Sequence, residues 1–126
     1  MAEERKLYEP VDGMKMPRFG AMPTFMRLPH IADFNSVDIA LTGVPWDGGT
    51  TNRAGARHGP REIRNMSSFM RRTHHALGIC PYELCRIADV GDVSINPIDV
   101  NDTIVRVEDF FSEIHEAGAV PLSAGG

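Results

Sequence analysis

Three short apolar runs follow one another from residue 37 to the end of the chain, and glycines lie at or just beyond their ends. A continuous apolar run of roughly four to eight residues is typical of a strand that is buried on both faces of a sheet. The runs predict strands over residues 38–43, 84–90 and 119–122. We expect Gly91 to end the second strand.

The two segments between these runs carry apolar residues three and four positions apart, which is the period of an amphipathic helix. They predict helices over residues 60–72 and 101–117. Pro60 suits the first turn of the first helix. Asn101 or Asp102 is expected to cap the second helix and Gly118 to end it. The positions expected to face inward are Ile63, Met66, Phe69 and Met70 in the first helix and Ile104, Val107, Phe111 and Ile114 in the second, with Arg61, Arg64, Arg71 and Arg72 facing outward.

The predicted elements alternate in the order strand, helix, strand, helix, strand. This alternation is typical of a parallel sheet with right-handed crossovers and helices on both faces. The sequence therefore predicts the α/β class, in three layers. In sheets of this kind, ligands bind beyond the carboxyl ends of the strands.

Residues 1–36 differ in composition from the rest of the chain, because prolines are spaced among methionines and other apolar residues. Prolines at this spacing suit neither a helix nor a central strand. The apolar residues are too many for a free linker. We interpret residues 1–36 as an arm that packs on the domain or on a neighbouring subunit.

Composition and charge narrow the class of protein. The chain has 126 residues, of which 42% are hydrophobic, so one domain with a real core is expected. The net charge of −4 and the pI near 5.7 do not indicate the excess of positive charge that binds nucleic acid. No apolar run reaches the roughly 18 residues of a membrane span, and residues 1–10 lack the apolar core of a signal peptide. We expect a cytoplasmic protein without nucleic-acid or membrane partners.

The loop after the first strand invites comparison with a phosphate-binding loop. Residues 43–50 nearly match the pattern G-x-x-x-x-G-K-[ST], but Gly49 stands where the lysine would reach the phosphates. Pro45 also removes one amide donor, and no helix is predicted directly after Thr50. A nucleotide-binding α/β protein is therefore an alternative that these residues do not favour.

Three motifs, in order along the chain, form a more specific pattern, and the first of them has two parts. Residues 43–47 read G-V-P-W-D and residues 53–64 read R-A-G-A-R-H-G-P-R-E-I-R. The second strand ends in Asp89-Val-Gly-Asp92, and the chain closes on Leu122-Ser-Ala-Gly-Gly126. Over residues 38–126 this resembles the ureohydrolase (arginase/agmatinase) family, and its agmatinase and guanidinobutyrase branch in particular. The closing run resembles the approach to that family's G-G-D-H element.

The resemblance implies an arginase-like fold, of which this chain would contain the first three strands. It also implies hydrolysis of a linear guanidino compound, such as agmatine or guanidinobutyrate, by two Mn²⁺ ions bridged by a hydroxide. The family's ligands are the His after Gly-Gly-Asp, a D-x-H-x-D group and a later D-x-D, and none lies in residues 1–126. We therefore expect residues 37–126 to be the N-terminal part of one ureohydrolase domain, truncated at Gly126. Alone, this chain would contain no catalytic residue and no metal ligand, and would bind Mn²⁺ weakly.

The complete protein is expected, by the same resemblance, to be a homo-oligomer, a trimer or a hexamer. A second hypothesis is a metal-free interaction module of the same fold that assembles with partners.

Five residues are candidates for the neighbourhood of the site. Asp47 and Arg53 lie in the loop after the first strand, where they could line the mouth of the site or hold the loop by ion pairing. We favour ion pairing, because a glycine-rich loop is costly to order and arginine offers a planar fork of donors. Asp92, Gly125 and Gly126 are expected at the carboxyl ends of their strands, next to the site.

Overall fold

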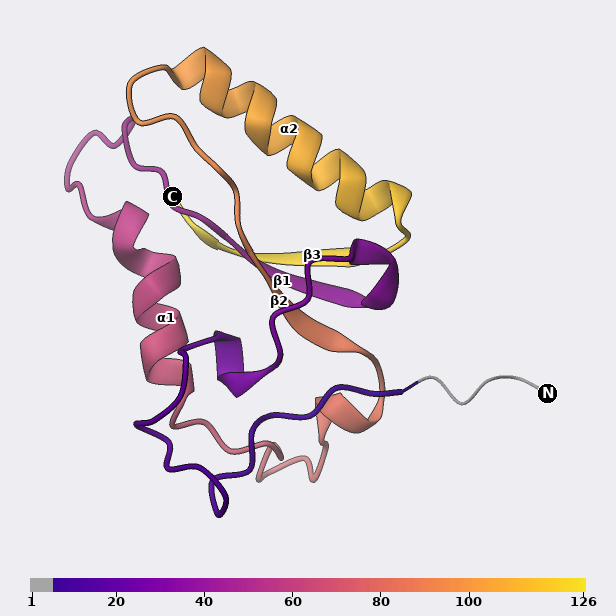
Figure 1. Ribbon diagram of the computed structural model, residues 1–126. Coiled ribbons are helices and arrows are strands. Elements are labelled where there is room, and N and C mark those ends of the chain that lie inside the picture. Colours follow the sequence, from indigo (N-terminus) through magenta and orange to yellow (C-terminus); the bar gives the residue numbers. More distant parts are fainter. Residues whose placement is uncertain (1–5) are drawn as a thin grey trace.

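The computed structural model describes residues 6–126. Three parallel strands form one sheet in the order β2-β1-β3: β1 (Ile39–Val44), β2 (Ile87–Asp92) and β3 (Val120–Gly125). Helix α1 (Gly59–Ser67) and helix α2 (Val100–Glu116) cover opposite faces of the sheet (Figure 1). The predicted α/β class, element order and parallel pairing are confirmed. Residues 1–5 of the predicted arm lie outside the described residues.

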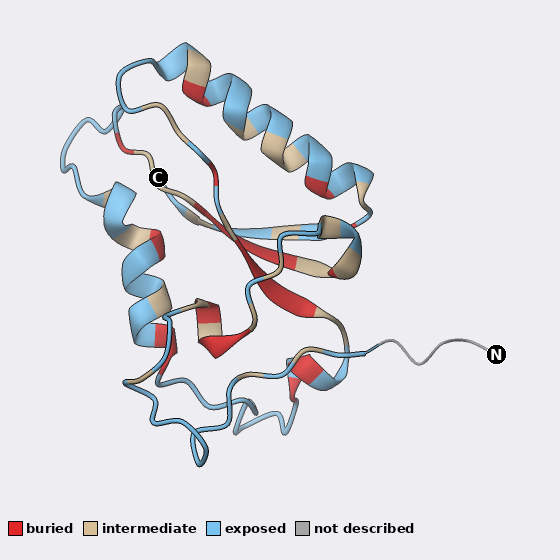
Figure 2. Cartoon of the chain, viewed as in Figure 1, coloured by how far each residue is buried: buried red, intermediate tan, exposed pale blue. Residues whose placement is uncertain are grey.

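Buried residues form one cluster on each face of the sheet. On the side of α1, Phe25 and Leu28 from the arm pack with Leu41, Tyr82 and Ile87. On the side of α2, the cluster consists of Val37, Ala40, Ala88, Val90, Ile114 and Ala119. Figure 2 shows that burial concentrates along β1 and β2, whereas β3 is largely exposed. The arm thus supplies part of the core.

Strand β2 differs from its prediction at both ends. It begins at Ile87 because residues Pro81–Glu83 form a 3₁₀ turn, η4, and the stretch that follows is held by the Asp38 carboxylate, which accepts from the backbone N–H of Arg86. It runs to Asp92, so the prediction that Gly91 ends it was wrong. The register steps from Leu41–Asp89 to Thr42–Gly91, which leaves Val90 as an extra residue in a bulge. Gly91 adopts φ +86, which a glycine tolerates without strain.

Helix α1 is shorter than predicted, and its inward face was predicted wrongly. It ends at Ser67, where the hydroxyls of Ser67 and Ser68 both donate to the carbonyl oxygen of Arg64. Such bonds compete with continuation of the helix. The four apolar residues that were expected to face inward are exposed to solvent: Ile63, Met66, Phe69 and Met70. Arg64, expected outside, points toward the sheet instead.

Helix α2 is close to its prediction. Asp99, two or three residues before the predicted cap, accepts from the backbone N–H groups of Asn101 and Asp102. Ile114 is fully buried as expected, whereas Ile104 is exposed. Gly118, at φ +77, follows the helix where predicted.

The arm crosses the outer edge of β2. The N–H of Ile31 donates to the carbonyl oxygen of Asp89, and the N–H of Asp89 donates to that of Pro29. These bonds pair the arm with the edge of β2 that faces away from β1. Among residues 6–126, no helix combines the length and apolar character that a membrane crossing requires.

Candidate functional site at the carboxyl edge of the sheet

The carboxyl ends of all three strands meet at one edge of the sheet. Val44, Asp92 and Gly125 are their last residues. The loop of residues 45–58 leaves β1 at this edge and leads into α1, whose first turn lies beside it. Parallel α/β sheets bind ligands at this edge, and the polar groups that organise it form two separate networks.

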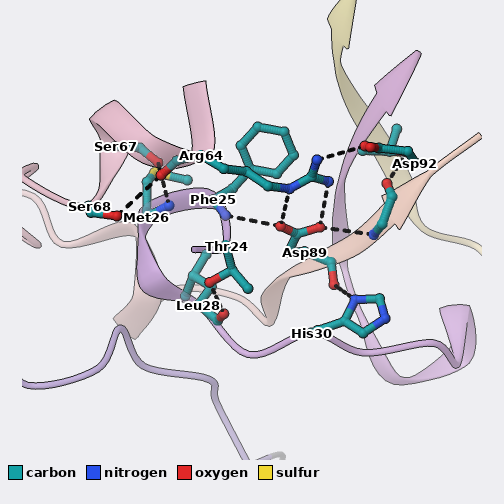
Figure 3. A network of polar contacts seen from close by, with 12 residues as sticks. Thr24, Phe25, Met26, Leu28, His30, Arg64, Ser67, Ser68, Asp89 and Asp92 are labelled. Carbon is teal, nitrogen blue, oxygen red and sulfur yellow. Dashed lines mark hydrogen bonds and ion pairs between the residues drawn. The ribbon is translucent and has the colours of Figure 1, made fainter. Parts of the chain in front are cut away.

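The first network joins α1 to β2 through one guanidinium (Figure 3). Arg64 donates from Nε to Asp89 Oδ2 at 2.7 Å and from Nη2 to Asp89 Oδ1 at 3.0 Å, which is a bidentate pair. Its Nη1 lies 2.8 Å from Asp92 Oδ1. The Arg64 guanidinium also lies 4.2 Å from the centroid of the Phe25 ring. One side chain therefore links the helix, the end of β2 and the arm.

Asp89 is a buried carboxylate in an otherwise apolar strand, and its side chain is 3% exposed. Besides Arg64 it accepts from the backbone N–H groups of Phe25, at 3.0 Å, and Gly91, at 2.9 Å. Burial alone would raise the pKa of Asp89, but the hydrogen bonds from Arg64 and from these two amides outweigh it and leave the pKa below its usual range. Asp89 is therefore a charged, fully engaged structural group.

Asp92 differs from Asp89 because its side chain is 38% exposed at the edge. Its carboxylate lies over the Cα of Gly43 in β1, where a Cβ would collide with Asp92 Oδ1 and would lie 2.6 Å from Cβ of Pro60. The end of β1, the first turn of α1 and Asp92 thus meet at Gly43. Arg64 holds the Asp92 carboxylate in place over that contact.

The second network closes the loop after β1. Asp47 is buried and accepts from the N–H of Gly55 at 2.6 Å, the N–H of Arg57 at 3.3 Å and Nε of Arg57 at 2.6 Å. The side-chain hydrogen bond from Arg57, followed by the amide of Gly55, lowers the pKa of Asp47 to about 2. Gly55 has φ +134, so the turn that presents its amide to Asp47 requires glycine.

Ion pairing holds this loop, but the partner of Asp47 is Arg57. Arg53 is exposed and makes no ion pair within the described part of the chain. Sequence reasoning did not single out this partner. The signal that could have found it is the left-handed glycine two residues earlier, which folds the loop back so that Arg57 meets Asp47.

The end of β3 lies directly beneath this loop. The N–H of Gly126 donates to the carbonyl oxygen of Val44 at 3.4 Å, and a Cβ at Gly126 would lie 2.5 Å from the oxygen of Trp46 and 2.6 Å from Cβ of Ala56. Gly125 is packed as tightly against Val44. The structure therefore brings Gly125 and Gly126 together with the Asp47 loop, and it places Asp92 across β1 from them.

The described residues hold the frame of a site but no metal centre. Among residues 6–126 there is no group of three or more His, Cys, Asp or Glu side chains that could hold a metal ion. Three carboxylates lie at this edge, and each forms an ion pair with an arginine: Asp47, Asp89 and Asp92. These residues therefore do not fit a metal site.

Comparison with known proteins agrees with this geometry. Guanidinopropionase from Pseudomonas aeruginosa is 56% identical over 118 residues, which are 94% of this chain and 37% of that protein. Guanidinobutyrase from the same bacterium is 40% identical over 126 residues, covering 98% of this chain and 40% of that protein. The solved structure of proclavaminate amidino hydrolase from Streptomyces clavuligerus superposes with a TM-score of 0.82 at 37% identity, over 87% of this chain and 36% of that one.

The chain thus spans about two fifths of the length of the relatives it matches. The sequence profile of the Arginase family matches residues 37–126, which include all three strands, both helices and the charged side chains of both networks at the carboxyl edge. This chain belongs to the arginase family.

Proposed function

We propose that the complete protein hydrolyses a linear guanidino compound to an amine and urea. The observation that supports this most strongly is the 56% identity with a guanidinopropionase, extending over 94% of the chain. Guanidinobutyrase and agmatinase relatives support the same reaction class at about 40% identity. In the reaction, water adds its oxygen to the guanidino carbon, the bond from that carbon to the alkyl nitrogen breaks, and the nitrogen leaves as a protonated amine.

Guanidinopropionate is the proposed first substrate, ahead of guanidinobutyrate and agmatine. The basis is the margin of 56% over 40% in identity between the two bacterial relatives. The three compounds differ in chain length by one or two methylenes and in carrying a carboxylate or an amine. One methylene changes discrimination by only about 10- to 200-fold, so activity on neighbouring guanidino acids is expected as well.

We propose two Mn²⁺ ions per subunit as the cofactor, with all ligands beyond Gly126. A guanidinium is cationic and resonance-stabilised, and paired metals supply a hydroxide at neutral pH by lowering the pKa of bound water. The role proposed for this chain is positional. The Asp47 loop and the Arg64 network fix the ends of β1, β2 and β3, with Asp47, Arg53, Asp92, Gly125 and Gly126 forming part of the rim of the site.

Calorimetric titration with Mn²⁺ tests this division of roles. The complete protein is expected to bind close to two Mn²⁺ ions per subunit, and residues 1–126 alone are expected to bind weakly and without defined stoichiometry. Tight stoichiometric binding by residues 1–126 would contradict it. A complete protein that binds no Mn²⁺ and releases no urea would instead support the alternative of a metal-free interaction module.

We also propose that the complete protein is a homo-oligomer, with arm residues 10–29 in its contacts. Three apolar side chains of the arm are largely exposed, Met14, Phe19 and Met22. Such exposure is typical of a surface that another chain covers. Deletion of residues 1–22, which spares the core residues Phe25 and Leu28, is expected to lower the oligomeric mass in light scattering, and an unchanged mass would contradict the proposal.

A further inference from the structure

Arg27 is a buried guanidinium that has no carboxylate partner among the residues that the structure describes. It is 6% exposed, and its one side-chain hydrogen bond within residues 6–126 runs from Nη2 to the carbonyl oxygen of Met16 at 2.9 Å. Its Nε is buried and has no partner in the described chain. Buried charges in proteins are normally paired, because an unpaired one loses its hydration without compensation. Within residues 6–126 the charge of Arg27 is therefore not balanced by a carboxylate.

The backbone holds Arg27 in this position against its own preference. Met26 and Arg27 both adopt left-handed conformations, with φ +53 and +58, which are uncommon outside glycine. The carbonyl oxygen of Arg27 accepts from the N–H of Val11 at 3.0 Å, and the N–H of Met26 donates to the hydroxyl of Ser67 at 2.9 Å. Strained conformations of this kind are retained where the surrounding structure fixes them, and they concentrate at ligand sites.

Arg27 lines a cavity of about 300 Å³ between the arm and the segment that follows α1. Lys15, Arg18 and Arg72 line it too, and Arg72 is paired with Glu9 and Glu83, so Arg27, Lys15 and Arg18 are the lining cations without a carboxylate partner among the described residues. Two carboxylates also line the cavity, and both already have partners. Glu9 lies 3.3 Å from Arg72, and Asp12 accepts from the N–H of Met14 at 2.9 Å within its own turn. Neither makes an ion pair with Arg27 among the described residues.

We propose that this cavity binds a small oxyanion, a carboxylate or a phosphate, on the Arg27 guanidinium. Arg27 is fixed before binding, so little side-chain freedom is lost when the anion arrives. Lys15 and Arg18 at the rim add favourable charge. The cavity lies past the last turn of α1, whereas the candidate site lies at its first turn, so this site is separate from the carboxyl edge. Figure 1 shows the first described part of the arm, in indigo, at the bottom of the molecule and away from the C-terminus.

The test is a titration of the complete protein with sodium phosphate and, separately, with sodium acetate, followed by thermal unfolding. Sodium chloride keeps the ionic strength constant. The proposal predicts a saturable rise in melting temperature with at least one of the two anions, and the anion that binds more tightly identifies the class of ligand. A rise that chloride alone reproduces, or no saturable rise with either anion, would overturn the proposal.

Arg27→Met is the decisive variant, because methionine keeps an apolar stem without the charge. The dissociation constant is expected to rise about tenfold or more, as for the loss of one hydrogen bond to a charged group. Without anion the variant is expected to be at least as stable as the wild type, because the unpaired buried charge is gone.

Two further variants keep the test decisive. Lys15→Met, at the exposed rim, should weaken binding without affecting the fold, so the proposal can fail even if Arg27→Met does not fold. Arg61→Met removes an exposed arginine from α1 and should leave binding unchanged. Equal binding by Arg27→Met and the wild type would overturn the proposal.

Discussion

Arg64→Met is the substitution that most directly tests the network between α1 and β2. Methionine retains the length of the side chain and can still contact the Phe25 ring, but it removes both hydrogen bonds to Asp89 and the ion pair with Asp92. The variant leaves Asp89, 2% exposed, as a buried carboxylate whose remaining donors among residues 6–126 are two backbone amides.

The expected loss in the free energy of unfolding is about 3 kcal/mol. Removing one partner of a buried ion pair costs about 3–5 kcal/mol, and the amides of Phe25 and Gly91 place Asp89 toward the lower end of that range. The pair with Asp92 is half exposed and adds little, since such pairs contribute about 0–1 kcal/mol. Arg64→Lys should recover only part of the loss, because an ammonium cannot reproduce the bidentate geometry.

Urea-induced unfolding of the complete protein at pH 7 and at pH 4 measures this loss. In the wild type the pKa of Asp89 is lowered, so its contribution to stability is present above its unfolded pKa and disappears as the pH falls below that value. In Arg64→Met, burial is less fully offset and the pKa of Asp89 rises. The difference between variant and wild type should therefore shrink at pH 4, where protonation relieves the unpaired charge.

The matched control is Arg61→Met, an exposed arginine on the same helix, which is expected to change stability by less than about 0.5 kcal/mol. An Arg64→Met variant as stable as Arg61→Met would refute the network. A loss that stays the same at both pH values would show that packing, and not the charge on Asp89, carries the effect.

Two other predictions concern the same edge of the sheet. Asp47→Asn should remove a pH dependence: with a pKa of about 2, Asp47 contributes stability that is complete above about pH 4 and is lost as the pH falls toward 2. Thermal unfolding between pH 5 and pH 2 should be flatter in the variant, and parallel curves would contradict the role of the loop. Gly43→Ala should destabilise by about 1–3 kcal/mol, because its Cβ would collide with Asp92 and Pro60. Gly59→Ala, where a Cβ meets nothing within 4 Å, is the control, and equal stability of the two variants would count against the contact at Gly43.

Local signals predicted the frame of this fold well. Pro60 and Gly118 act through their own backbone preferences, so the start of α1 and the end of α2 could be located from single residues. The prediction that Gly91 ends β2 was wrong. A glycine after an apolar run suggests the end of a strand, whereas here it lies inside the strand, next to a bulge. The α/β class followed from the alternation of elements and did not depend on these ends.

The candidate site was less predictable because its contacts are long-range. The period of α1 placed Arg64 outside, since a helical pattern cannot detect a carboxylate that lies 25 residues later in the sequence. A buried aspartate in an apolar strand does require a cation, but several arginines were available. Asp47 presented the same choice between Arg53 and Arg57, and the left-handed turn at Gly55 decided it.

Urea release is the most direct test of the proposed hydrolysis of a guanidino compound by the complete protein. The Mn²⁺-loaded protein should convert guanidinopropionate to urea and aminopropionate in equal amounts, with kcat/KM higher than for guanidinobutyrate or agmatine. Equal activity on guanidinobutyrate would correct the substrate and leave the reaction class intact. No urea from any of the three compounds, with Mn²⁺ bound at two ions per subunit, would contradict the proposed hydrolysis.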